Sequence, residues 1–393
     1  MNRTRPTLPL PSTDAQDASH ALQAMIIAQI AAQGGWLSFA RFMELALYAP
    51  GLGYYSGGAS KLGKSGDFTT APEISPLFGK TLAHFCFPLL QQSRSQIMEF
   101  GAGTGKLAHD ILQELHAQGV ALEKYYIVEV SGQLRAQQEQ TLAAFTEVEW
   151  LEQLPNSFEG VMIGNEVLDA MPVQLVQKDA QGAGWREMGV SFNKIGESAE
   201  LVWQTQPCSP QLLQQLQEQI PHADSLPPGY VTELHAQAAS FMRSVSSMLA
   251  AGRGAAIWFD YGFAAHEYYL DQRRAGTLMC HYRHHAHAEP FYWPGLQDIT
   301  AHVDFSLMAR AALASGLDLL SYSNQAGFLL EAGLARLLEQ LDVQDVVNYL
   351  PQVNAAGKLL AAHEMGELFK VLVVGKAVHL ADGWGRIARQ ARL

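Results

Sequence analysis

The sequence is poor in cysteine, and its few cysteines stand far apart. Cys86, Cys208 and Cys280 are the only three in 393 residues, and none lies at the spacing of a metal or redox motif. We therefore expect reduced thiols in a reducing compartment. The first residues carry no apolar signal-like segment, so a cytoplasmic location is expected.

Long apolar runs and an excess of positive charge are also missing. No apolar run approaches the ~20 residues that cross a bilayer, so no membrane span is expected. The chain has 26 Lys and Arg against 38 Asp and Glu, a formal net charge of −12. This balance disfavours sequence-independent binding to nucleic acid or to anionic membranes, because both require a basic surface.

A glycine-rich turn follows a short apolar segment at Gln96–Phe100, which reads as a buried strand. Gly101, Gly103 and Gly105 form the turn, and an amphipathic helix is expected after it. A strand, a glycine turn and a helix place the backbone beside a nucleotide-like ligand. A dinucleotide fingerprint needs a third glycine where this chain has Lys106, so a nicotinamide oxidoreductase is a disfavoured alternative.

An acidic residue, Glu99, lies two residues before this turn. A pyrophosphate would be repelled there, whereas a cationic ligand would be attracted. S-adenosylmethionine carries a sulfonium and an ammonium group, and the stretch resembles the turn of class I methyltransferases. We therefore expect this cofactor; an ordinary tight turn without a ligand is the alternative.

Two further strands are expected to complete the cofactor site. Tyr125–Glu129 ends in Glu129, whose carboxylate is expected to accept hydrogen bonds from ribose hydroxyls. The alternative for Glu129 is a solvated strand end. After a third strand at Val148–Trp150, Trp150 and Leu151 are expected either to line the adenine or to belong to the core.

A polar cluster follows a fourth apolar strand at Gly160–Gly164. Asn165, Glu166 and Asp169 come directly after it, where the fourth strand ends beside the first. We expect this cluster to meet the substrate, although polar groups in this position can also be helix caps.

The glycine-rich loop at residues 51–73 contains a formal P-loop match at Gly58–Ser65. The match lacks the strand before it and the helix after it that a phosphate-binding loop requires. A flexible flap is the preferred interpretation, and a plain turn into the next helix is the alternative. Five of its residues are expected to close over the ligand: Asp67, Phe68, Thr69, Thr70 and Glu73.

The order of elements predicts an α/β fold with a doubly wound, mostly parallel sheet, because strands and helices alternate from Ile97 onward. We expect a mobile tail at residues 1–18, with a helix capped by Ser19. A helical cap and the flap are expected over 19–95, and the core over 96–393. Residues 173–250 break the alternation and predict an insertion for substrate selection, with a β-hairpin at its start.

No metal site is predicted, because the histidine-rich loop His281–His287 has no metal-binding signature.

Taken together, the chain resembles the MidA family of S-adenosylmethionine-dependent methyltransferases from about Phe42 to Lys376. The segments that carry the resemblance are Gly53-Tyr-Tyr, Gly66-Asp-Phe-Thr-Thr-Ala-Pro-Glu-Ile-Ser, Glu99-Phe-Gly-Ala-Gly-Thr-Gly, Val128-Glu-Val-Ser, Asn165-Glu-Val-Leu-Asp-Ala-Met-Pro, Asp260-Tyr-Gly, Thr300-Ala-His-Val-Asp-Phe and Met365-Gly-Glu-Leu-Phe-Lys.

The resemblance implies a class I Rossmann-like fold of seven strands with the last strand antiparallel. It also implies methylation of an arginine in a protein substrate, with a respiratory complex I subunit as the partner in the mitochondrial case. Glu166, Asp169 and Glu73 are then the expected catalytic carboxylates, since carboxylates can hold a guanidinium in a bidentate way. A non-catalytic assembly factor that retains the cofactor pocket is the alternative.

Overall fold

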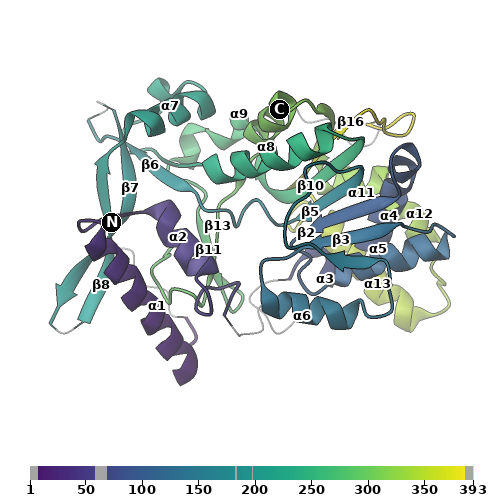
Figure 1. The fold of residues 1–393 in the computed structure, drawn as a ribbon, viewed down its shortest axis with the longest axis horizontal. Helices are drawn as coiled ribbons and strands as arrows, with labels where there is room; N and C mark the ends of the chain where they lie inside the picture. The colour runs from purple at the N-terminus through teal and green to yellow at the C-terminus, as the bar shows by residue number, and fades with distance from the viewer. Residues whose placement is uncertain (1–7, 58–68, 182–183, 197, 386–392) are drawn as a thin grey trace. The chain divides into compact units, whose positions relative to one another are not determined.

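The structure is a computed structural model that describes residues 8–57, 69–181, 184–196, 198–385 and 393 (Figure 1). The chain folds into two compact units that alternate along the sequence. The first unit comprises Met1–Phe68, Leu168–Ala239 and Ala265–Asp304, and the second comprises Thr69–Val167, Ser240–Ala264 and Phe305–Leu393. The cap, core and insertion boundaries expected from the sequence stay a prediction. Among the described helices, none has both the length and the apolar character needed to cross a bilayer.

The second unit is built on one large sheet (Figure 1). Its strands follow the order β15-β16-β10-β5-β2-β3-β4. The strands β4, β3, β2, β5 and β10 run parallel, and β16 runs antiparallel to β10 and β15. The predicted parallel sheet with an antiparallel last strand is therefore confirmed. The strand bounds are β2 Gln96–Phe100, β3 Lys124–Val128, β4 Val148–Trp150, β5 Gly160–Asn165, β10 Gly254–Phe263, β15 Asp318–Asn324 and β16 Phe369–Lys376.

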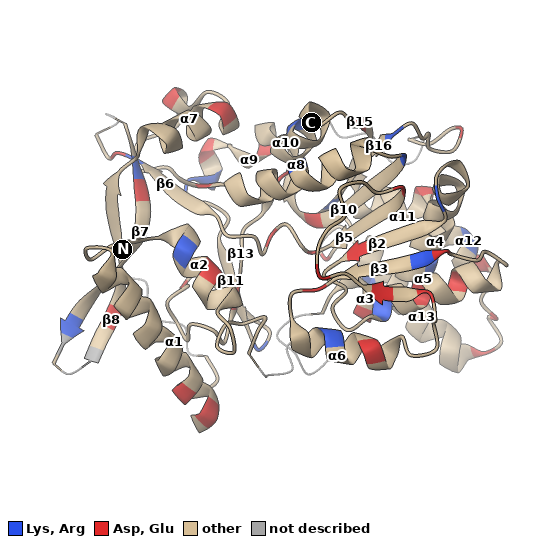
Figure 2. Ribbon diagram, in the orientation of Figure 1, with Lys and Arg blue, Asp and Glu red and all other residues tan. Residues whose placement is uncertain are grey.

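The central strands are apolar because helices cover both faces of this sheet. Strand β5 carries no charged residue and is uniformly tan in Figure 2. On one face, α4 (Pro76–Gln92) and α5 (Lys106–Ala117) join the strands in one buried cluster. Phe78 of α4 lies edge-on to Phe259 of β10, with ring centroids 5.2 Å apart.

Three aromatic rings pack on the opposite face. Phe241, from α8 (Ala236–Ala250), lies 5.3 Å from the Phe100 ring and 5.6 Å from the Trp258 ring. A Cβ atom on Gly164 would come within 2.4 Å of the Trp258 ring, so the indole requires a glycine at this position of β5. The contact between Gly164 and the Trp258 ring thus fixes the carboxyl-terminal end of β5.

Helix α4 begins where the sequence predicts. The Ser75 hydroxyl accepts a hydrogen bond from the Leu77 N–H at 3.2 Å, and Pro76 occupies the first helical position. The remaining helices that lie within the second unit are α3 Ala71–Ile74, α6 Gly132–Thr141, α10 Phe305–Ala314, α11 Gln325–Glu331, α12 Leu334–Glu339 and α13 Val346–Leu360.

The first unit begins with α1 (Thr13–Ala32), which starts earlier than expected. Ser12 caps it by accepting a hydrogen bond from the Ala15 N–H at 3.4 Å. The expected cap, Ser19, is instead a buried residue inside the helix, and its hydroxyl donates to the Pro294 carbonyl. The prediction of a cap at Ser19 was wrong, and residues 13–18 of the expected tail are helical.

The predicted hairpin of the first unit is confirmed by the antiparallel pairing of β6 (Gln174–Lys178) with β7 (Trp185–Ile195). A second sheet pairs β11 (Met279–Tyr282) with β12 (His285–His287), setting Cys280 opposite His287. Among the described residues, no group of three or more Cys, His, Asp or Glu side chains could hold a metal ion. The other elements are β1 Leu37–Ser38, α2 Phe39–Tyr48, β8 Ser198–Pro207, α7 Pro210–Gln219, β9 Val231–Leu234, α9 Ala265–Tyr268, β13 Asp298–Thr300, β14 Val303–Asp304 and two short 3-10 helices, Ala223–Ser225 and Asp271–Arg273.

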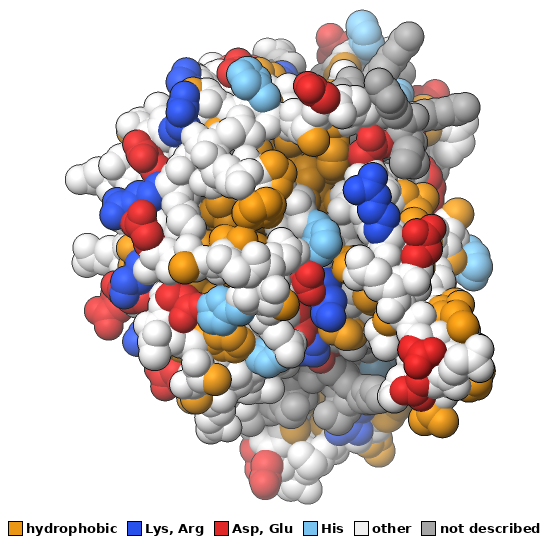
Figure 3. Space-filling view, turned by 90° about the vertical axis from the view of Figure 1, so that its right-hand side faces the viewer, with side chains coloured by type: hydrophobic (Ala, Val, Ile, Leu, Met, Phe, Trp, Pro, Cys, Tyr) orange, Lys and Arg blue, Asp and Glu red, His pale blue; other side chains and the backbone are white. Residues whose placement is uncertain are grey.

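Basic side chains are dispersed on the face that Figure 3 draws. The Lys and Arg side chains of the described residues lie there singly or in small groups among acidic and apolar ones.

The packing around Phe328 predicts a large loss of stability on truncation. Phe328 is fully buried, and its ring lies 4.8 Å from that of Phe85 and 5.1 Å from that of Phe259. Phe328→Ala should lower the free energy of unfolding by about 3–5 kcal/mol, because it removes apolar contacts and leaves a cavity. Urea titration measures the change. The control Val347→Ala, at a residue 81% exposed, should stay within about 0.5 kcal/mol of wild type. Equal effects of the two substitutions would contradict this account of the core.

Candidate active site

The glycine turn after β2 uses backbone conformations that residues with side chains rarely adopt. The φ angles of Gly101, Gly103 and Gly105 are 66°, 54° and 83°. Gly105 directly precedes α5 in the left-handed conformation. Gly101 donates its N–H to the Val128 carbonyl at 3.0 Å, which fixes the turn to the end of β3. The glycines are thus required by the backbone itself.

Glu99 lies buried just before this turn. Its side chain is 2% exposed and accepts a hydrogen bond from the Tyr125 hydroxyl at 2.6 Å. Burial raises the pKa of Glu99 to about 7; the Tyr125 hydrogen bond opposes the shift and the nearby Glu129 charge adds to it. Within the described part of the chain, no lysine or arginine forms an ion pair with Glu99 or Glu129. A cationic ligand would supply the missing charge.

Glu129 directly follows β3, the neighbouring parallel strand. One carboxylate oxygen, Oε1, accepts from the Ser131 N–H at 2.8 Å, and Oε2 accepts from the Gln138 amide at 2.9 Å. Burial raises its pKa, and these hydrogen bonds lower it in part. Each carboxylate oxygen thus accepts one of these two hydrogen bonds, and a carboxylate offers about four acceptor sites in all.

Gln138, on α6, joins three of the predicted site segments, and sequence reasoning missed it. Its Nε2 donates to Glu129 and to the Gly103 carbonyl, the latter at 2.9 Å. Its Oε1 accepts from the Trp150 indole at 2.9 Å. The signal in the sequence is weak, because Gln138 is one of several glutamines on a polar helix and only its full burial distinguishes it.

Leu151 lies half-buried at the end of β4, and its N–H donates to the Ile127 carbonyl at 2.9 Å. Because β2, β3 and β4 run parallel, Trp150 and Leu151 lie at the carboxyl-terminal ends of the strands, as the glycine turn does. Their contact with an adenine stays a prediction.

Asn165 is the last residue of β5, on the other side of β2, and Glu166 directly follows it. Phe100 pairs with Gly164, so Gly101 and Asn165 are the next positions along two neighbouring strands. Asn165 donates to Glu166 Oε1 at 3.0 Å, and its own Oδ1 is buried without a hydrogen-bond partner in the described structure. Such an orphaned acceptor is costly unless a ligand donates to it.

Glu166 adopts a left-handed backbone conformation with φ 56°, which costs on the order of 1–3 kcal/mol for a residue with a side chain. Its N–H donates to the Phe259 carbonyl at 2.9 Å. Asp260, 1% exposed, accepts from the Val167 N–H at 3.2 Å and from the Tyr261 N–H at 2.9 Å. Asp260 thereby holds the strained segment in place, a role that its sequence motif did not reveal.

Of the remaining predicted site residues, only some lie near the glycine turn in the described structure. Glu73, on α3, accepts a hydrogen bond from the Thr104 hydroxyl of the glycine turn. Thr69 and Thr70 directly precede α3, and Asp67 and Phe68 lie outside the described residues. Asp169 belongs to the first unit, where it is 7% exposed. A joint site of Asp169 with Glu166 stays a prediction.

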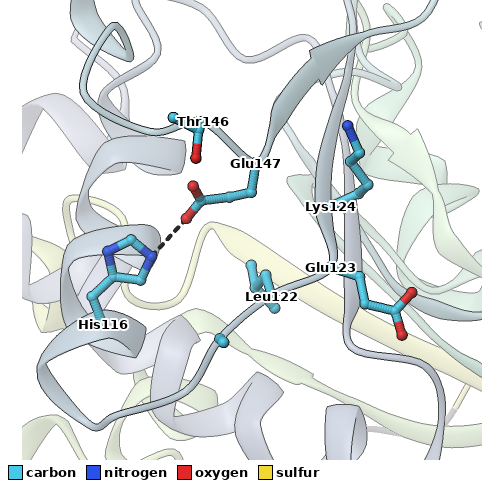
Figure 4. A pocket seen from close by; sticks show the side chains of 7 residues that line it. His116, Leu122, Glu123, Lys124, Thr146 and Glu147 are labelled. Carbon is cyan, nitrogen blue, oxygen red and sulfur yellow. Dashed lines mark hydrogen bonds and ion pairs between the residues drawn. The ribbon is translucent and has the colours of Figure 1, made fainter.

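A separate pocket of about 330 Å³ lies at the amino-terminal ends of β3 and β4 (Figure 4). It is lined by residues that precede or begin β3 and β4, including Lys124 and Glu147, and His116 contacts Glu147 at 2.6 Å. None of the predicted site residues lines this pocket. We therefore place the candidate site at the carboxyl ends of β2, β3, β4 and β5.

This strand order, glycine turn and row of strand-end acids define a class I S-adenosylmethionine-dependent methyltransferase. Residues 81–323 match the family model described as an S-adenosyl-L-methionine-dependent methyltransferase. The chain belongs to this family, the MidA family, as its sequence motifs predicted.

The relatives agree with this assignment. A Burkholderia thailandensis protein solved with S-adenosyl-homocysteine bound is 49% identical, with a TM-score of 0.90, over 98% of this chain and 99% of that one. The chain is 28% identical to the Danio rerio protein arginine methyltransferase NDUFAF7, mitochondrial, over 88% of this chain and 85% of that protein. The Homo sapiens protein of the same name is 27% identical, over 91% and 84%. The cofactor is therefore S-adenosylmethionine.

The environment of Glu99 predicts that cofactor binding depends on pH. With a pKa of about 7, Glu99 is mostly protonated near pH 5.5 and mostly ionised near pH 8. A cationic ligand selects the ionised form, so the Kd of S-adenosylmethionine should fall about tenfold or more as the pH rises from about 5.5 to about 7.5. Calorimetric titration at several pH values measures this.

Glu99→Gln is the matched variant, because it keeps the shape and cannot ionise. It should bind more weakly at high pH and lose this pH dependence. In the ligand-free wild-type protein, the pH dependence of folding stability has the opposite direction to that of cofactor binding. Stability should fall between about pH 4.5 and about pH 7, because the unfolded chain releases the proton first. An identical pH profile in the variant would exclude Glu99 from cofactor binding.

Proposed function

We propose that this protein transfers a methyl group from S-adenosylmethionine to a guanidinium nitrogen of an arginine in a protein substrate. The observation that carries the proposal is the acceptor pair after β5. Asn165 presents a buried oxygen without a partner in the described structure, and it orients the Glu166 carboxylate through a hydrogen bond. An unfilled acceptor beside a carboxylate suits a flat, cationic group with several N–H donors.

The reaction is an in-line displacement, in which a nitrogen–carbon bond forms while the sulfur–carbon bond breaks. The bound cofactor supplies the methyl group and leaves as S-adenosylhomocysteine. Arginine stays protonated in proteins, so the reacting nitrogen must be aligned and must lose a proton as the bond forms. Glu166 is proposed to hold the guanidinium and to accept that proton, with Asp169 and Glu73 as further carboxylates. Alignment of the reacting atoms supplies much of the rate.

Each part of the cofactor is proposed to contact a different group of these residues. Glu99 faces the ammonium and sulfonium groups of the methionine part, over Gly101, Gly103 and Gly105. Glu129 accepts the ribose hydroxyls, and Trp150 and Leu151 contact the adenine. Thr69 and Thr70, directly before α3, are proposed to close over the ligand.

The acceptor class is supported by the relatives named protein arginine methyltransferase, at 27–28% identity. The family resemblance suggests a respiratory complex I subunit as the protein partner. A cytoplasmic location is part of the same proposal.

Glu166→Gln tests the proposal directly. The amide keeps the size of the side chain but cannot take a proton or a charge. Methyl transfer to an arginine-containing protein substrate should fall by about 100-fold or more. The Kd of S-adenosylmethionine should stay within about threefold of wild type. Single-turnover kinetics with isotope-labelled cofactor and calorimetry give the two numbers.

The matched control is Glu152→Gln, the same change at an exposed carboxylate of the same unit. It should leave both transfer and binding at the wild-type level. Undiminished transfer by Glu166→Gln would remove Glu166 from the chemistry. Loss of cofactor binding in that variant would assign Glu166 to the cofactor instead.

A further inference from the structure

Helix α6 carries one buried polar side chain that contacts three parts of the cofactor site. Gln138 is fully buried, although the neighbouring residues Gln137 and Glu139 are exposed. Burying a primary amide is costly unless its hydrogen bonds are satisfied. The three hydrogen bonds that its side-chain amide forms with described residues all go to segments of the predicted cofactor site.

The three partners admit only one orientation of the amide. The Gly103 carbonyl and the Glu129 carboxylate can only accept, and both receive Nε2–H bonds at 2.9 Å. The Trp150 indole can only donate, and it meets Oε1 at 2.9 Å. The amide is therefore locked, and it fixes the glycine turn, the carboxylate and the indole relative to one another.

A second residue of α6 strengthens the same connection. The Thr141 hydroxyl, one turn after Gln138, donates to the Thr104 carbonyl of the glycine turn at 2.9 Å. A Cβ atom on Gly105 would lie 3.4 Å from the Gln138 Cα atom. Helix α6 thus lies directly against the glycine turn through its backbone as well as its side chains.

We propose that Gln138 is a positioning residue that orients the Glu129 carboxylate for the ribose hydroxyls and couples it to the glycine turn and to Trp150. The Gln138 amide binds one oxygen of Glu129 and the Ser131 N–H binds the other, so the carboxylate plane is fixed from both sides. The proposal concerns the cofactor and does not depend on the identity of the methyl acceptor. It does depend on the ribose-binding role of Glu129.

The test compares two probes, S-adenosylhomocysteine and its analogue lacking the ribose 2′-hydroxyl, by calorimetry. Wild type should bind the complete probe about tenfold more tightly, because the analogue loses a hydrogen bond to the half-buried Glu129 carboxylate. Gln138→Met, of similar length but without polar atoms, should weaken the complete probe about tenfold or more. It should weaken the analogue much less, so the ratio of the two Kd values should approach one.

Gln138→Glu gives an independent signature that does not require loss of packing. A carboxylate at this position can still accept from Trp150, but it donates to Glu129 only when it is protonated. Affinity for S-adenosylhomocysteine, divided by that of wild type at the same pH, should therefore rise as the pH falls from about 8 to about 6. The control Gln137→Glu, the same change at the exposed neighbouring residue, should give a ratio near one at both pH values.

Two results would overturn the proposal. An equal loss of affinity for both probes in Gln138→Met would show that Gln138 only maintains the fold. Equal binding of both probes by wild type would remove the ribose role of Glu129 and the proposal with it. In both cases the arginine-methylation proposal would be left standing, because neither result bears on the acceptor.

Discussion

Two carboxyl groups lie at the ends of neighbouring parallel strands, Glu99 buried and Glu129 half-buried, and neither forms an ion pair with a lysine or arginine among the described residues. Glu99 is the last residue but one of β2, just before the glycine turn, and Glu129 directly follows β3. Removing a carboxylate from water is costly without a compensating charge, and the raised pKa of Glu99 records that cost. The site is therefore built to receive a ligand that brings its own positive charge and its own hydroxyl donors.

The surrounding fold keeps these groups from relaxing. Tyr125 holds Glu99 from beneath, and Gln138 holds Glu129 from the side. The indole of Trp258 fills the space below Gly164, so the end of β5 cannot shift without losing packing. Glu166 keeps a strained backbone angle because the buried Asp260 binds the N–H of the next residue. Strain of this kind is typical of functional sites.

Much of this arrangement could be predicted from the sequence, because it depends on local patterns. The glycine turn, the strand-end acids and the alternation of strands and helices each follow from residues close together in the chain. The sheet topology confirms the parallel sheet and the pairing of β2 with β5 that this alternation predicted. The start of α1 was missed because Ser12 and Ser19 are equally good caps by residue type, and only tertiary packing selects between them.

Gln138 and Asp260 could not be identified by the same reasoning. Their roles come from contacts with segments distant in the chain, such as Gln138 with Gly103 and Asp260 with Val167. In the sequence alone, neither a glutamine in a polar helix nor an acidic residue within a strand stands out. Their burial, which the sequence does not show, gives them their importance.

The identity of the methylated atom tests the account most directly. The purified protein would be incubated with a cellular protein extract and S-adenosylmethionine carrying an isotope-labelled methyl group, and the acid-hydrolysed products analysed by mass spectrometry. The account predicts label in methylated arginine, and none in a reaction that lacks the protein. Label in another amino acid, at a level that depends on the protein, would contradict the assignment of an arginine acceptor to the Asn165 and Glu166 pair.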